Sequence, residues 1–136
     1  MANEKTVPKE LAEQEFARFL EAMDLTEKCD TSAMDLEDVK GFEKHKRVIM
    51  SALERMQLVI DEDGQPTLTT SSGAKITFYE PTGGDLMAMD QAKAGRDVEK
   101  TNKVLAAMTK QPAALFAGMK NRDYRICSSL FTLFLA

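Results

Sequence analysis

An acidic run, Asp61-Glu62-Asp63, followed by Gly64 is the most evident candidate for chemistry in this chain. Carboxylates closely spaced before a glycine are typical of calcium-binding loops. The register fails, however: with Asp61, Asp63 and Gly64 at loop positions three, five and six, position one is Val59 and position twelve is Thr70. An Asp-Gly pair between apolar runs is instead typical of a hairpin turn. We therefore expect a turn here, and no metal site.

Histidine and cysteine give no second candidate. The chain has one histidine, His45, beside the apolar side of an expected helix, which predicts a partly buried boundary residue. Cys29 and Cys127 fit no metal or redox spacing, and Cys127 lies in an apolar segment where a small buried side chain is expected. Gly83-Gly84 lacks the lysine of a phosphate-binding loop, and no nucleophile-elbow or zinc-protease motif is present. We expect no catalytic residue, no cofactor and no enzyme activity.

A sharp corner in the second half of the chain has a clear local signature. Residues 76–80 alternate between two faces, as a strand does, and Pro81 is expected to end that strand. Thr82 and Asp85 have the spacing of a capping box, in which each side chain accepts from the other's backbone amide. Two glycines in the first helical turn lower helix propensity, which predicts close packing or unusual torsions there. The corner consists of Pro81, Thr82, Gly83, Gly84 and Asp85.

Apolar spacing along the chain predicts an α+β fold that is mostly α. A small antiparallel sheet of two or three strands is expected over about 58–80, from runs at 58–60, 66–70 and 76–80. About five helices should pack on it, at 8–23, 35–56, 86–93, 97–110 and 124–136, with a short helical turn at 112–117. Residues 1–57 then form an N-terminal helical extension, and 58–136 form a hairpin and helical domain.

Composition is that of a soluble globular protein, with 43% hydrophobic and 29% charged residues. A net charge of −4 argues against general nucleic-acid binding, which requires clustered bases. Residues 1–65 carry 16 acids against 9 bases (−7), and 66–136 carry 6 against 9 (+3), a difference that permits attraction between halves or subunits. No apolar run could span a membrane and no secretion signal opens the chain, so a cytosolic location is expected.

The segment 124–136 is apolar on nearly all sides. A helix of this kind has to be buried, either in the core of its own chain or against a partner. We therefore expect it to contribute to an oligomeric or partner interface. Nine methionines add adaptable apolar surface, although core packing explains them equally well.

Three motifs carry a resemblance to a known family. They are the corner 81–86 with sequence PTGGDL, the pair Asp123-Tyr124, and the ending Phe134-Leu135. Over about residues 66–136 the chain resembles the small tail assembly chaperones of Mu-like contractile-tailed phages and prophages. Residues 1–60 lie outside this resemblance.

The resemblance implies a chaperone in the host bacterial cytoplasm that binds the tape-measure protein and keeps it soluble while the tail tube assembles. The tail tube protein is a further implied partner, and a homo-oligomer is expected, with no nucleic acid and no membrane. The candidate partner-binding residues, each of which core packing would also explain, are Leu86, Met87, Met89, Phe131 and Phe134. The alternatives are a structural virion component, such as a small baseplate or tail-completion protein, and a bacterial adaptor or regulator unrelated to phage.

Overall fold

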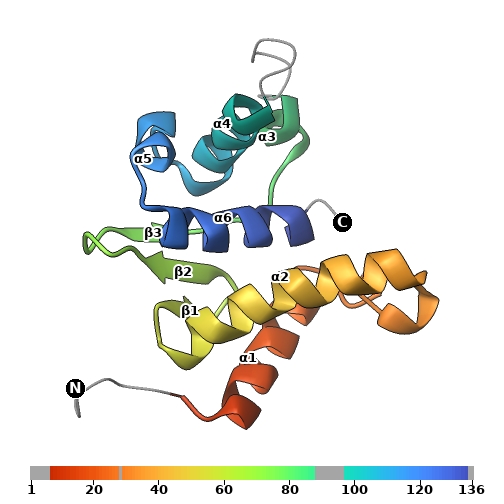
Figure 1. Ribbon diagram of the computed structural model, residues 1–136. Helices are drawn as coiled ribbons and strands as arrows, with labels where there is room; N and C mark the ends of the chain where they lie inside the picture. Colours follow the sequence, from red (N-terminus) through yellow and green to blue (C-terminus); the bar gives the residue numbers. More distant parts are fainter. Residues whose placement is uncertain (1–6, 28, 88–96, 135–136) are drawn as a thin grey trace.

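A computed structural model describes residues 7–27, 29–87 and 97–134 of the chain (Figure 1). This part folds into six α-helices and a three-stranded antiparallel sheet, which confirms the expected α+β, mainly helical class. In chain order the elements are α1 (Lys9–Ala22), the 3-10 turn η1 (Thr31–Ala33), α2 (Leu36–Glu54), β1 (Leu58–Ile60), β2 (Pro66–Thr69), β3 (Lys75–Thr77), α3 (Gly83–Met87), α4 (Asp97–Thr109), α5 (Ala113–Ala117) and α6 (Asn121–Phe134).

The first two helices are amphipathic and pack on the rest of the fold. In α1 an apolar stripe is buried, with Phe16 and Phe19 at its centre, whereas Leu11 is 45% exposed. The α2 helix begins where Asp35 accepts a hydrogen bond from the backbone amide of Asp38 at 2.9 Å, and it buries Ile49 along its second half. Both helices contact β1. Their side chains belong to the same hydrophobic core as those of the sheet and α6.

The sheet has the order β1-β2-β3, and its pleat sets one apolar face. Leu58 lies opposite Leu68, which in turn lies opposite Ile76, and all three are buried. The acidic run between β1 and β2 is a hairpin turn, as predicted. The Asp61 carboxylate accepts from the backbone amides of Asp63 at 2.9 Å and Gln65 at 2.8 Å. This carboxylate therefore holds the turn together.

An arginine from α1 fixes that helix to the hairpin. The Arg18 guanidinium donates to the carbonyl oxygens of Asp61 at 2.6 Å and Ile60 at 2.7 Å, and to the Glu15 carboxylate at 2.8 Å. The hydrogen bond from Arg18 lowers the pKa of Glu15 and, in return, raises that of Arg18. Gly64 at the tip of the turn lies directly against Ala22 at the end of α1.

Several predicted boundaries were wrong, and the third strand shows why. The strand was expected to run to Glu80, but β3 ends at Thr77. Its partner strand β2 begins at Pro66, which has no N–H to donate to a further pair. After β3, the Tyr79 amide donates instead to the carbonyl of Met108 in α4 at 3.1 Å. The chain thus leaves the sheet for α4 before it reaches Pro81. Helix α6 likewise begins three residues earlier than expected, at Asn121, and α3 begins at Gly83, directly after the Thr82 cap, and not at residue 86. The part of that expected helix beyond Met87 lies outside the described residues.

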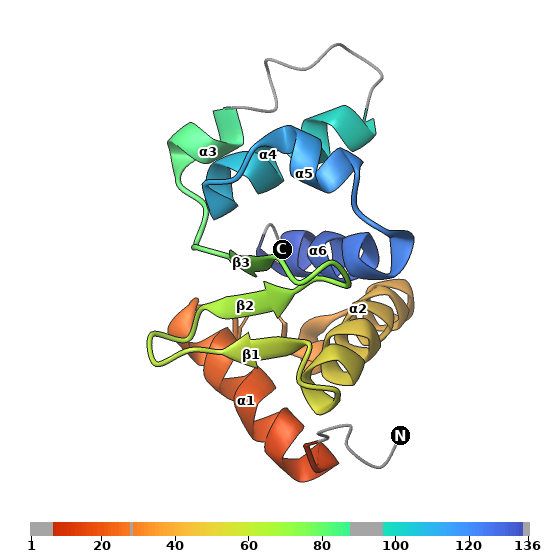
Figure 2. The same cartoon turned by 90° about the vertical axis from the view of Figure 1, so that its left-hand side faces the viewer.

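The last helix lies in the middle of the fold. It contacts α2 on one side and α4 on the other, with the sheet beside it (Figures 1 and 2). Phe134, near its end, is 7% exposed and meets the ring of Phe19 edge-on, with 5.5 Å between the ring centroids. Most apolar residues of α6 are therefore buried within the chain itself, whereas Tyr124 and Phe131 are partly buried. The buried residues of this helix are Asp123, Ile126, Cys127, Ser129, Leu130, Leu133 and Phe134.

Candidate partner-binding groove

The corner before α3 forms the predicted capping box. The Thr82 amide donates to Asp85 at 2.9 Å, and the Asp85 amide donates to the Thr82 hydroxyl at 3.1 Å. The two glycines were expected to indicate close packing or unusual torsions, and the described residues show neither. A Cβ on Gly83 would meet no atom within 4 Å, a Cβ on Gly84 would meet only Thr82 Oγ1 at 3.6 Å, and neither residue has a positive φ. Glycine is therefore not required here by the packing of the described residues.

The predicted partner-binding residues separate into different environments. Met87 is 66% exposed at the end of α3. Phe131 is partly buried and lines a groove, whereas Phe134 lies in the core. Met89 and the side chain of Leu86 lie outside the described residues. Among the predicted partner-binding residues whose side chains the structure describes, Met87 and Phe131 have surface that a partner could contact.

The groove that Phe131 lines runs between α2 and α6 and has a volume of about 620 Å³; we call it the α2–α6 groove. One wall is the N-terminal half of α2, and the other is the C-terminal end of α6. From α2 it is lined by Glu37, Asp38, Gly41, Phe42 and His45. From α6 it is lined by Phe131, Thr132 and Leu133, and from the segment before α2 by Cys29 and Met34.

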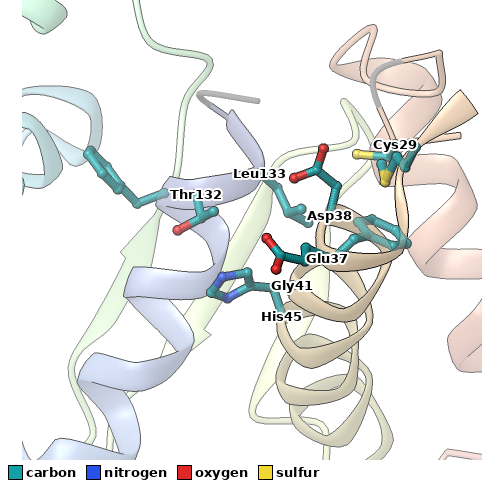
Figure 3. Close-up of a pocket in the computed structure, with 10 residues that line it drawn as sticks. Cys29, Glu37, Asp38, Gly41, His45, Thr132 and Leu133 are labelled. Carbon is teal, nitrogen blue, oxygen red and sulfur yellow. The ribbon is translucent and has the colours of Figure 1, made fainter. Parts of the chain in front are cut away.

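The lining of the α2–α6 groove combines apolar walls with an acidic rim. Figure 3 shows the side chains of Glu37, Asp38 and His45 directed from α2 toward the space that faces α6. Both carboxylates are exposed. Burial, followed by the nearby positive charge of Lys44, lowers the pKa of His45 and so favours its neutral form. The ionised groups of the lining are thus both acids, and the groove favours an apolar partner that carries positive charge.

A serine and a histidine meet beneath this groove. His45 Nδ1 lies 3.0 Å from Ser129 Oγ, a spacing that also occurs between a nucleophile and its base. Ser129 is only 2% exposed and does not line the groove, so a substrate in the groove cannot reach its hydroxyl. The hydrogen bond instead joins α2 to α6, and His45 is partly buried, as expected from the sequence.

Sequence reasoning missed the role of Asp123. This carboxylate is 1% exposed and accepts hydrogen bonds from Gln57 Nε2 at 2.7 Å, the Ser71 amide at 3.0 Å and the Ser71 hydroxyl at 3.2 Å. The neighbouring Tyr124 hydroxyl donates to Asn102 Oδ1 in α4 at 2.6 Å. The Asp-Tyr pair therefore joins α6 to the sheet turns and to α4. An acid in the first turn of the helix, directly before the apolar segment that begins at Tyr124, was the available signal.

Comparisons with known proteins assign no family. No family model, curated protein or solved structure matches this chain significantly. In the described part of the chain, no three His, Cys, Asp or Glu side chains are grouped so that they could hold a metal ion. Among the helices described there, none is both long enough and apolar enough to cross a membrane.

Proposed function

We propose that this protein is a phage tail assembly chaperone that binds the tape-measure protein and keeps it soluble in the host bacterial cytoplasm while the tail tube assembles. The observation that carries the proposal is the α2–α6 groove, with Phe131 on its wall. Support from the sequence comes from the PTGGDL corner, whose capping box is formed, and from the Asp123-Tyr124 pair, whose hydrogen bonds join the elements around α6.

The groove suits the task because a tape-measure protein is long, helical and apolar. An amphipathic helix binds a groove of this kind by inserting side chains three and four residues apart. Phe42 and Phe131 are only partly buried and offer apolar surface, and burial of such surface stabilises a complex by about 25 cal/mol per Å². A partner helix covered in this way cannot aggregate through the same face. Such a protein needs binding surface and no catalytic group.

A structural virion component is the second candidate, and a different observation favours it. A second apolar hollow of about 200 Å³ lies between α1, the end of α2 and β1, where Leu11, Met56 and Val59 are 42–48% exposed. A permanent part of a particle has several neighbours, and a second apolar surface provides for another contact. Self-association into a homo-oligomer fits either candidate. The tail tube protein is a further partner that also fits either one.

Co-expression with a candidate tape-measure protein tests the proposal. We expect the tape-measure protein to become soluble and to co-purify, and Phe131→Asp to abolish both effects. Val98→Asp controls for the added negative charge, because Val98 is 66% exposed on α4 and does not line the groove, and circular dichroism of Phe131→Asp checks that this variant is folded. If the tape-measure protein stays insoluble and this protein is found in finished particles, the structural role replaces the chaperone role.

A further inference from the structure

Gly41 is a glycine inside a long helix. It lies six residues into α2, where glycine destabilises a helix by about 1 kcal/mol relative to alanine. A Cβ at this position would meet no described atom within 4 Å, and the residue does not have a positive φ. Neither backbone torsion nor the packing of the described residues therefore requires glycine here.

The position of Gly41 in the α2–α6 groove supplies a reason. Glu37 and Asp38 lie one turn before it and His45 one turn after it, so all four residues share the helix face that lines the groove. The absence of a side chain at the centre of this face exposes the α2 backbone to whatever enters. Glycine is the residue that allows a bound segment to approach a backbone closely, and small residues at the contact bring two helices closer together.

We infer that Gly41 is the point at which a partner helix crosses α2, and that this helix presents Lys or Arg to Glu37 and Asp38 beside its apolar face. The inference rests on the proposed function, because it names the chemistry of the segment that the groove receives. The occupant is an amphipathic helix with basic residues at one edge, since the ionised side chains of the lining are acids and the remaining walls are apolar. Such a segment is expected in the tape-measure protein.

The inference is tested with overlapping peptides of about 20 residues from the tape-measure protein, whose binding is measured by fluorescence anisotropy. We expect the tightest peptide to be amphipathic and basic. Gly41→Leu should weaken its binding about tenfold or more, because the leucine side chain fills the crossing point. Gly41→Ala should weaken it less. It should also stabilise the free protein, because alanine lowers the conformational entropy of the unfolded chain and its methyl group meets no atom in the folded one. Gly83→Leu, outside the groove, is the matched control and should leave binding unchanged.

The charge contact is tested separately with Glu37→Gln combined with Asp38→Asn. This variant should bind the basic peptide more weakly, with a shallower dependence on salt, and should no longer distinguish it from a peptide whose Lys and Arg are replaced by Gln. Equal binding of both peptides by the unmodified protein would overturn the assigned charge.

The failure of this inference differs from that of the proposed function. If Phe131→Asp blocks capture of the tape-measure protein and Gly41→Leu does not, the function stands and the crossing point is wrong. If neither the intact tape-measure protein nor any of its peptides binds, the proposed function fails. If Gly41→Leu changes only self-association in sedimentation experiments, the occupant is a second copy of this chain and the inferred basic helix is refuted.

Discussion

Gly64 and Gly73 provide a matched pair of substitutions that tests how α1 lies on the hairpin. Both glycines have a positive φ, +81° for Gly64 and +92° for Gly73, and both lie in turns of the sheet. A Cβ on Gly64 would lie 2.2 Å from the Cβ of Ala22, whereas a Cβ on Gly73 would meet no described atom within 4 Å. Alanine at either position therefore has the same backbone strain, but only at Gly64 does it collide with α1.

The expected magnitudes follow from these two terms. An L-residue in the left-handed region costs about 1–2 kcal/mol, and the lower entropy of the unfolded chain offsets about 0.4–1 kcal/mol of that cost. Gly73→Ala should therefore lower the free energy of unfolding by about 1 kcal/mol. Overpacking adds about 1–3 kcal/mol at Gly64, because the methyl group of Ala22 has no torsion that could move it away. We expect Gly64→Ala to cost about 2–4 kcal/mol in total.

Urea unfolding followed by circular dichroism measures both costs, and a double-mutant cycle isolates the contact. In an Ala22→Gly background the nearest atoms to the new methyl group lie at 3.7 Å, so Gly64→Ala should then cost no more than Gly73→Ala does. The coupling between positions 22 and 64 should be about 1–3 kcal/mol. Equal costs for the two glycine variants, with no coupling to Ala22, would refute this placement of α1 against the turn.

Three further predictions concern buried polar groups. Asp123→Ala should lower the free energy of unfolding, measured with urea, by about 1–3 kcal/mol, because the Gln57 amide and the two Ser71 donors lose their acceptor, and an unchanged free energy of unfolding would contradict this account. Because folding lowers the pKa of His45 below its ordinary value of 6.5, its contribution to stability is present above about pH 6.5 and is lost as the pH falls through the folded pKa. His45→Gln should flatten this pH dependence, and an unchanged slope between about pH 5.5 and 7.5 would exclude His45 as its source. Burial raises the pKa of Cys127 to about 12, so in Cys29→Ser protein a thiol reagent should label Cys127 only after unfolding, and rapid labelling of the native protein would contradict its burial.

Local features of this fold could be predicted from the sequence. The capping box of Thr82 and Asp85, the Asp-Gly turn and the apolar stripe of α1 each depend on residues within a few positions of one another. Their energetics are decided by short-range hydrogen bonds and helical spacing, which the sequence displays directly. The mainly helical class followed from these elements.

Features that depend on tertiary contacts could not be predicted. The end of β3 at Thr77 reflects where β2 begins and where Met108 offers a carbonyl, both of which are set by packing. The role of Asp123 depends on Gln57 and Ser71, which are 66 and 52 residues away in the sequence. The α2–α6 groove likewise has walls about 90 residues apart in the chain, so no local spacing could indicate it.

The burial of α6 changes which surface of this protein is available to a partner. From the sequence, its all-round apolar character was compatible with a partner interface as well as with a core. In the structure α2 and α4 cover the helix, so its composition is explained by the core and supplies no separate argument for a partner. What remains available is the groove between α2 and α6, which Phe131 lines.

One wall of that groove therefore comes from residues outside the resemblance to tail assembly chaperones. Gly41, Glu37 and Asp38 belong to α2, whereas the resemblance begins at about residue 66. A relative that shares only the hairpin and the later helices would lack the acidic rim and the open backbone of α2. It follows that the N-terminal helices, and not the shared corner, should decide which helical segment this protein accepts. Charge reversal at Glu37 and Asp38 should accordingly shift its preference toward acidic helices, while changes at Thr82 or Asp85 should alter stability without altering that preference.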